Sequence, residues 1–188
     1  TNTLNSGDGG NIDISTNQLK ILDGATISST TFNSGNAGNL TIHAREFVEV
    51  IGLDATFAVA SLLSSLTLGS GDGGNLTLNT QNLTVKNSGR VDASTANSGA
   101  AGSVTINASD KVELAGSSTI QELIIPSRIT SSADIADKSL QEILGIPVIL
   151  TGDSGAITIN TNQLNIADGA LLAVKNDGSG NAGKLQVK

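Results

Sequence analysis

Aliphatic and polar residues alternate in short runs that recur along the whole chain. In the first run, Ile12 and Ile14 alternate with Asn11, Asp13 and Ser15. The same alternation returns at Leu40/Ile42, Leu76/Leu78, Val104/Ile106, Ile157/Ile159 and Leu185/Val187. Alternation over four to six residues is typical of a β-strand with one buried face. The pattern therefore predicts six copies of one strand, with their aliphatic side chains in columns.

A Gly-x-x-Gly motif precedes each of these runs. The copies read GDGGNIDIS, GNAGNLTIH, GDGGNLTLN, GAAGSVTIN, GDSGAITIN and GNAGKLQVK, starting at Gly7, Gly35, Gly71, Gly99, Gly152 and Gly180. Their second glycines are Gly10, Gly38, Gly74, Gly102, Gly155 and Gly183, so the separations are 28, 36, 28, 53 and 28 residues. A constant unit of this length is typical of a solenoid, and the two longer separations indicate insertions in alternate units.

Two further segments of each copy carry apolar residues in matching positions. The first holds Leu19/Ile21, Val48/Val50, Leu83/Val85, Val112/Leu114 and Leu164/Ile166, and it lies one residue later in the second and fourth copies. A turn follows, such as DGA at Asp23 or SGR at Ser88, in which Gly is expected to supply a positive φ. A third strand then begins near Ile27, Leu63, Val91 and Leu172. The sequence predicts an all-β fold, a right-handed parallel β-helix (solenoid) of about six turns with three short strands per turn.

The expected insertions cover residues 53–68 and 116–150. The first is strongly apolar for a loop, and the second contains a segment in which Asp137 is expected to cap a short helix ending at Leu144. The second insertion is expected to lie against the outside of the coil or to cover an exposed edge. Residues 1–188 are thus interpreted as a single β-helix segment of a longer repeat protein, since the last copy stops partway through its unit.

Composition narrows the classes of function. The chain has 188 residues, a net charge of −7, only 14% charged residues and no Cys. Nucleic acid is not an expected partner, because Lys and Arg form no basic run. No apolar run is long enough to span a bilayer, so membrane insertion is not expected. No signal peptide is recognised at the start of the sequence.

Two sets of residues suggest metal chemistry at first sight. Asp8, Asp72 and Asp153 occupy the same position of alternate units, about 9.6 Å apart if the units stack as strands. Calcium needs several oxygens around one centre, so the interpretation here is that Asp and Asn stabilise the turn by bonding their own backbone. His43 is the only histidine, and it is expected on the surface. No metal site and no cofactor are predicted.

Two other columns suggest other functions. Thr41, Thr77, Thr105 and Thr158 resemble an ice-binding array, but the adjacent column of Ser15, His43, Asn79, Asn107 and Asn160 does not match it. Glu49 and Glu113 lie two units apart on one face, near the ~9.5 Å limit for an inverting glycosidase pair. Nothing aromatic surrounds them, so solvated strand-face charges are the favoured interpretation. No catalytic residue is predicted.

The motifs together resemble a known family. GNAGNLTIHAREFVEV, GDGGNLTLNTQNLTVKNSGRVDASTANSGAAGSVTINASDKVEL and ADGALLAVKNDGSGNAG look like repeats of filamentous haemagglutinin-like exoproteins, most of all the large cyanobacterial ones. The resemblance covers nearly the whole chain apart from 134–150. It implies a right-handed parallel β-helix, export from a bacterium by two-partner secretion, and a role as an adhesin or filament at the cell surface. No functional residue of the family maps onto a position here.

The leading hypothesis is a non-enzymatic, extracellular structural or adhesive segment. Its expected partner is a glycan, a matrix component or the surface of a host or neighbouring cell. A carbohydrate-active β-helix or glycan-binding module and a scaffold that self-associates end to end are the alternatives. Any specific partner is expected to contact the inserted turns at 53–68 and 116–150 and not the Gly motif.

Overall fold

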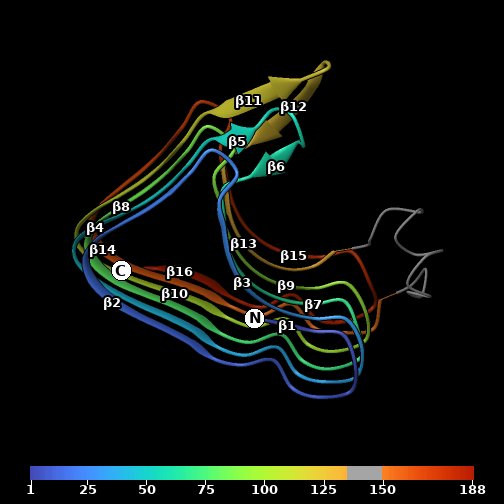
Figure 1. Ribbon diagram of the computed structural model, residues 1–188. Helices are drawn as coiled ribbons and strands as arrows, with labels where there is room; N and C mark the ends of the chain where they lie inside the picture. Colours follow the sequence, from blue (N-terminus) through green and yellow to red (C-terminus); the bar gives the residue numbers. More distant parts are fainter. Residues whose placement is uncertain (135–149) are drawn as a thin grey trace.

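The computed structural model describes residues 1–134 and 150–188, and every regular element in these ranges is a β-strand. Most strands belong to two six-stranded parallel sheets (Figure 1). The long-strand sheet contains β2 (Ile12–Leu22), β4 (Leu40–Ile51), β8 (Leu76–Lys86), β10 (Val104–Ala115), β14 (Ile157–Ala167) and β16 (Leu185–Val187). The short-strand sheet contains β1 (Asn2–Thr3), β3 (Thr26–Thr31), β7 (Leu62–Thr67), β9 (Arg90–Thr95), β13 (Arg128–Ala133) and β15 (Leu171–Asn176).

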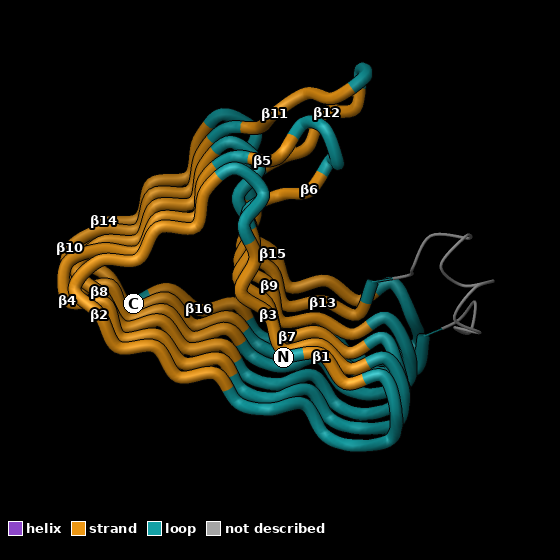
Figure 2. The backbone as a smooth tube through the Cα atoms, in the orientation of Figure 1, coloured by secondary structure: helices purple, strands orange, loops and turns teal. Residues whose placement is uncertain are grey.

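Successive repeat units stack in sequence order in both sheets. A unit consists of a Gly-rich stretch, a long strand and a short strand, and Figure 2 shows the units lying one above another. Leu40 pairs with Leu76, Leu76 with Val104, and Val104 with Ile157, so the first aliphatic residues of these strands share one column. The columns of aliphatic residues predicted from the alternation are therefore confirmed.

The first two predicted strands of each unit form one continuous strand, so a unit has two strands where three were expected. In Figure 2 each long strand bends around one end of the structure. The pairing of β2 with β4 is interrupted after Thr16, which lies opposite Ala44, and it resumes with Gln18 opposite Phe47. One residue of β2 and two residues of β4 lie between these pairs. β4 and β10 have 12 residues, whereas β2, β8 and β14 have 11. The extra residue is a β-bulge, and it explains why the second segment lies one residue later in alternate copies.

The core lies between the two sheets. Its aliphatic columns from the long strands, such as Ile42, Leu78 and Ile106, are fully buried. The short strands contribute one aliphatic column to the core, which includes Leu63, Val91 and Ile129. They also contribute two buried polar columns that the sequence did not predict. One includes Ser29, Ser65 and Ser131, and the other includes Thr31, Thr67 and Thr95. The serines are satisfied at the Gly-rich stretch, because Ser65 Oγ donates to the Gly38 carbonyl at 2.9 Å. Ser131 Oγ likewise donates to Gly102 at 2.8 Å.

The described parts of the predicted insertions, 53–68 and 116–150, are not irregular throughout. Within the first, only β5 (Leu53–Asp54) and β6 (Val59–Ala60) leave the repeat, as an antiparallel hairpin. Within the second, β11 (Ser117–Ile120) and β12 (Leu123–Pro126) form another hairpin. β7 and β13 lie inside the predicted insertions but pair as regular strands, because their inward positions match the core columns. The expected helix from Asp137 to Leu144 lies outside the described residues.

Candidate functional site

The Gly-x-x-Gly stretch is a place where backbones of neighbouring units meet closely. A Cβ on Gly35 would lie 2.0 Å from the Gly7 carbonyl oxygen, and one on Gly38 would lie 2.2 Å from that of Gly10. Real side chains cannot approach so near, so both glycines are required by contact and not by a positive φ. The motif brings units together and leaves no room between them for a ligand.

Polar residues inside the motif form a ladder of hydrogen bonds along the stack. In this first Asx ladder (positions 8, 36, 72, 100, 153 and 181), Asp8 Oδ1 accepts the Asn36 N–H at 2.8 Å. Asn36 Oδ1 accepts the Asp72 N–H at 2.8 Å, and Asp72 Oδ1 accepts the Ala100 N–H at 2.8 Å. Each carboxylate or amide therefore bonds the backbone of the next unit, and not its own backbone as the sequence suggested.

A second Asx ladder runs in parallel three residues later (positions 11, 39, 75, 103, 156 and 184). Asn11 Oδ1 accepts the Asn39 N–H at 2.8 Å, and Asn39 Oδ1 accepts the Asn75 N–H at 2.8 Å. Among the described residues, no three His, Cys, Asp or Glu side chains gather in a way that suits a metal ion. The ladders use Asp8, Asp72 and Asp153 as hydrogen-bond acceptors that hold neighbouring units together.

Glu49 and Glu113 do not resemble a catalytic pair. They are two strand positions apart in the long-strand sheet, with Thr84 between them. Glu49 Oε2 lies 3.2 Å from Lys20 Nζ. Glu113 lies 2.7 Å from Lys86 Nζ and 3.0 Å from Lys111 Nζ. Hydrogen bonds from these two lysines hold the pKa of Glu113 below its ordinary value, whereas a general acid needs a raised pKa.

The other candidate columns are regular parts of the long-strand sheet. Thr41, Thr77, Thr105 and Thr158 are register neighbours, as expected from the repeat. In the adjacent column, Asn107 Nδ2 donates to Asn79 Oδ1 at 2.8 Å and Asn160 Nδ2 donates to Asn107 Oδ1 at 2.7 Å. His43 is exposed at the end of this amide ladder, beside a hollow of about 470 Å³ lined also by Ser15, Thr16, Asn17 and Arg45. This column thus stabilises the stack.

Turns after the long strands alternate between two kinds. After β2, β8 and β14 the turn has two central residues with positive φ: Asp23–Gly24, Asn87–Ser88 and Asp168–Gly169. This backbone suits a type I′ turn, which Asn, Asp and Gly favour. Gly89 does not supply the positive φ expected of it from the SGR motif. A Cβ on Gly89 would instead lie 1.9 Å from the Val50 carbonyl oxygen of the unit before.

After β4 and β10 the turn is replaced by a hairpin, and we call β5–β6 and β11–β12 the hairpin arms. Both arms are closed at the base in the same way. Gly52 and Gly116 have φ of 87° and 76°, and their carbonyls accept the N–H groups of Ser61 and Ser127 at 2.9 Å each. The Ser127 hydroxyl is buried, donates to the Ala115 carbonyl at 2.8 Å, and accepts the Ser88 N–H at 3.0 Å.

Each arm is anchored on the tight turn of the unit before it. Ser88 Oγ donates to the Ile125 carbonyl at 2.6 Å and accepts the Ser118 N–H at 2.9 Å. Beyond these bases the arms stand at one corner of the structure (Figure 1). Their outer parts expose Phe57, Leu123 and Ile124 to 75%, 65% and 66%. The arms are therefore firmly held projections that present apolar side chains to solvent.

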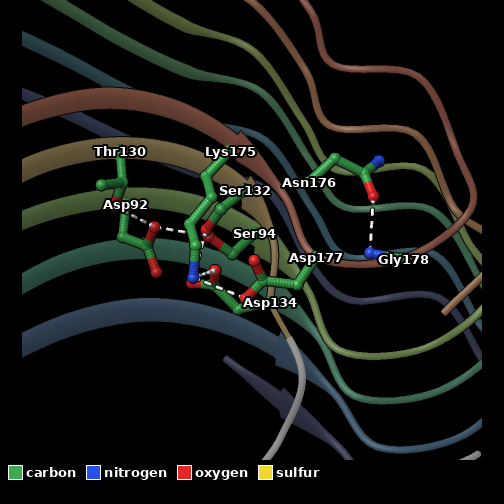
Figure 3. Close-up of polar contacts among 9 residues, drawn as sticks. All are labelled: Asp92, Ser94, Thr130, Ser132, Asp134, Lys175, Asn176, Asp177 and Gly178. Atoms are coloured by element: carbon green, nitrogen blue, oxygen red, sulfur yellow. Dashed lines mark hydrogen bonds and ion pairs between the residues drawn. The ribbon is translucent and has the colours of Figure 1, made fainter. Parts of the chain in front are cut away.

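A polar network crosses the outer face of the short-strand sheet (Figure 3). Ser94 and Ser132 hydroxyls lie 2.8 Å apart, and Ser132 Oγ donates to Asp134 Oδ2 at 2.8 Å. Lys175 Nζ then pairs with Asp134 at 3.4 Å and with Asp177. The hydrogen bond to Asp177 and the nearby Asp134 raise the pKa of Lys175. Every charged group here has a partner, so the network ties together β9, β13 and β15.

None of the segments that the structure describes forms a helix long and apolar enough to cross a bilayer. Comparisons with protein-family models, with curated proteins and with solved structures found no match to this chain. The case for function therefore comes from the residues of this chain and their geometry. Within the described part of the chain, the hairpin arms are the candidate contact surface. They are also the parts of the predicted insertions that leave the repeat.

Proposed function

We propose that this chain is a segment of a right-handed parallel β-helix that acts as a non-enzymatic, extracellular adhesive rod of the filamentous haemagglutinin-like kind. The two parallel sheets, the stacked units and the Asx ladders support the role of a stiff scaffold. The observation that carries the adhesive role is the pair of hairpin arms, because they expose apolar side chains from rigid bases. Such side chains suit contact with a protein at a cell surface or in a matrix.

The test is attachment of the purified chain to cells and to immobilised matrix proteins. The variants Phe57→Ser and Leu123→Ser remove apolar contact area from the arms, and both are expected to reduce attachment. Leu4→Ser is the matched control, because Leu4 is 74% exposed but lies outside the arms. Attachment that the arm variants leave unchanged, or that Leu4→Ser reduces equally, would refute the proposal.

Self-association is measured on the same samples by light scattering. If the arms bind a cell or a matrix protein, the chain stays monomeric and attachment saturates with concentration. If the arms or the strand edges bind a second copy instead, scattering rises with concentration and the arm variants alter it. The second outcome would replace the adhesive rod by the self-assembling scaffold.

A further inference from the structure

Two arginines stand side by side on the outer face of the short-strand sheet. Arg90 begins β9 and Arg128 begins β13, and the two are direct register partners. Neighbouring parallel strands lie about 4.8 Å apart, so the two side chains leave the sheet close together. The next residues, Val91 and Ile129, are fully buried in the core, so the arginines point away from it.

Among the described residues, no carboxylate forms an ion pair with either arginine of this pair. The Nε atoms of Arg90 and Arg128 are buried and have no hydrogen-bond acceptor. In residues 1–134 and 150–188, neither guanidinium takes part in an ion pair, whereas Lys20, Lys86, Lys111 and Lys175 all do. Burial, and then the neighbouring Arg128, lower the pKa of Arg90, and Asp92 offsets this only partly.

The surroundings supply little compensation from the protein. The neighbours of the pair in the same column are Leu62 on one side and Leu171 on the other. Asp92 is the nearest carboxylate along the strand, but its Oδ1 already accepts hydrogen bonds from Thr130 Oγ1 at 2.7 Å and from Ser94 Oγ. Two like charges with buried, unsatisfied donors are costly unless a ligand satisfies them.

We propose that Arg90 and Arg128 form a binding site for a tetrahedral oxyanion group, a sulfate or a phosphate. A guanidinium presents a planar fork of donors that matches such oxygens. A carboxylate has two oxygens and is used up by one fork, whereas a tetrahedral group has enough oxygens to bridge two forks on neighbouring strands. The site is separate from the apolar residues of the hairpin arms, so it stands even if the arms bind no cell.

The direct test is nuclear magnetic resonance of the arginine Nε–H groups. Inorganic sulfate and inorganic phosphate are titrated in turn against chloride at constant ionic strength. The Nε–H signals of Arg90 and Arg128 are expected to shift together and to saturate, while that of the exposed Arg45 stays in place. Absence of saturating shifts, or equal shifts at Arg45, overturns the proposal.

Three variants separate a built site from general attraction to anions. Arg128→Gln should weaken binding about tenfold or more, because one charged set of hydrogen bonds is lost. Arg128→Lys keeps the charge but loses the fork, so weakened binding is expected there too. Arg45→Gln makes the same change of charge elsewhere and should leave affinity unchanged; an equal loss in Arg45→Gln, or none in Arg128→Gln, contradicts the site.

The source of the oxyanion is decided by the same titration with a polymer. If dextran sulfate shifts the Nε–H signals of Arg90 and Arg128 and competes with inorganic sulfate for binding, the site accepts a sulfate ester carried on a polysaccharide. Signals that respond to inorganic sulfate but not to dextran sulfate show a site for the free ion. Neutral dextran is the blank, and a response to it contradicts an anion site.

Discussion

The first Asx ladder is interrupted at one position, and repairing it should stabilise the protein. Ala100 occupies the place held by Asn36 in an otherwise similar motif, GAAG against GNAG. Because its side chain has no oxygen, Ala100 cannot accept the N–H of Asp153 in the next unit. Elsewhere in the ladder that bond is made, at 2.8 Å from Asp72 to Asn36 and at 2.6 Å from Asn181 to Asp153. Ala100→Asn should restore it.

The expected gain is that of one hydrogen bond at a half-buried position, about 1 kcal/mol. For a chain of this size such a gain raises the thermal midpoint by about 2–4 °C. Ala100→Asp should stabilise the protein less than Ala100→Asn, because its carboxylate would lie between Asp72 and Asp153 at about 4.8 Å from each. Each of these repulsions costs about 0.9 kcal/mol even in water, so together they offset the new bond.

The measurement is urea and thermal unfolding of the wild type and of the two Ala100 variants. Asn36→Ala is the reverse control, since it removes an existing bond and should cost about as much as the repair gains. Added salt should raise the stability of Ala100→Asp towards that of Ala100→Asn, because salt screens the repulsion between the carboxylates. If Ala100→Asn and Asn36→Ala both leave stability unchanged, the ladder contributes nothing and the reasoning is refuted.

Three further changes test other parts of the fold. Ser127→Ala should cost about 1–3 kcal/mol, because it leaves the buried Ser88 N–H unsatisfied; hydrogen exchange at that amide should also quicken. Gly89→Ala should destabilise more than Gly169→Ala in urea unfolding, because a Cβ at Gly89 collides with backbone whereas Gly169 has open space and only a positive φ. Two lysines lower the pKa of Glu113 in the folded protein. The stabilisation from ionised Glu113 is therefore complete above the pKa of the unfolded chain and is lost as the pH falls through the lowered pKa of the folded state. Glu113→Gln should remove this dependence and flatten the plot of unfolding free energy against pH between about pH 6 and pH 3.

The alternation of aliphatic and polar residues was enough to predict the stack. Leu40, Leu76 and Val104 are spaced by the repeat, and a one-residue slip would have moved each of them from the core to solvent. The pattern also revealed the one-residue delay in alternate copies, which the structure shows as a β-bulge. Local periodicity carries this information because each strand lies against a copy of itself.

What the sequence did not predict depends on contacts between units. Ser65 and Thr67 look like surface residues of a strand, but they are buried because the Gly-rich stretch passes close enough to accept a hydrogen bond from Ser65. Gly89 was predicted to be a turn glycine with a positive φ, yet it is required because a Cβ there would collide with a carbonyl of the preceding unit. The boundary of the first insertion was too wide, because the apolar β7 does not differ in composition from the hairpin before it.

The arginine pair was missed for a related reason. Arg90 and Arg128 are 38 positions apart in the sequence, and no spacing rule marks them as neighbours. They become partners only because the second arm lengthens the intervening unit without changing the register of β9 and β13. That their Nε atoms have no acceptor among the described residues is a property of the assembled sheet and has no sequence signal.

The Asx ladders give the stack a polarity. In every rung, an earlier unit offers the side-chain oxygen and a later unit offers the backbone N–H, as in Asp8 with Asn36 and in Asn75 with Ser103. The side-chain oxygens of the ladders therefore all point to the same side of a unit, towards its successor, while backbone bonds such as Gly9 N–H to the Asn36 carbonyl run the other way. An inverted neighbour would bring the side-chain oxygens of two units against each other and leave these oxygens without a backbone N–H. Each unit is thus a one-sided template, able to order its successor in a single orientation.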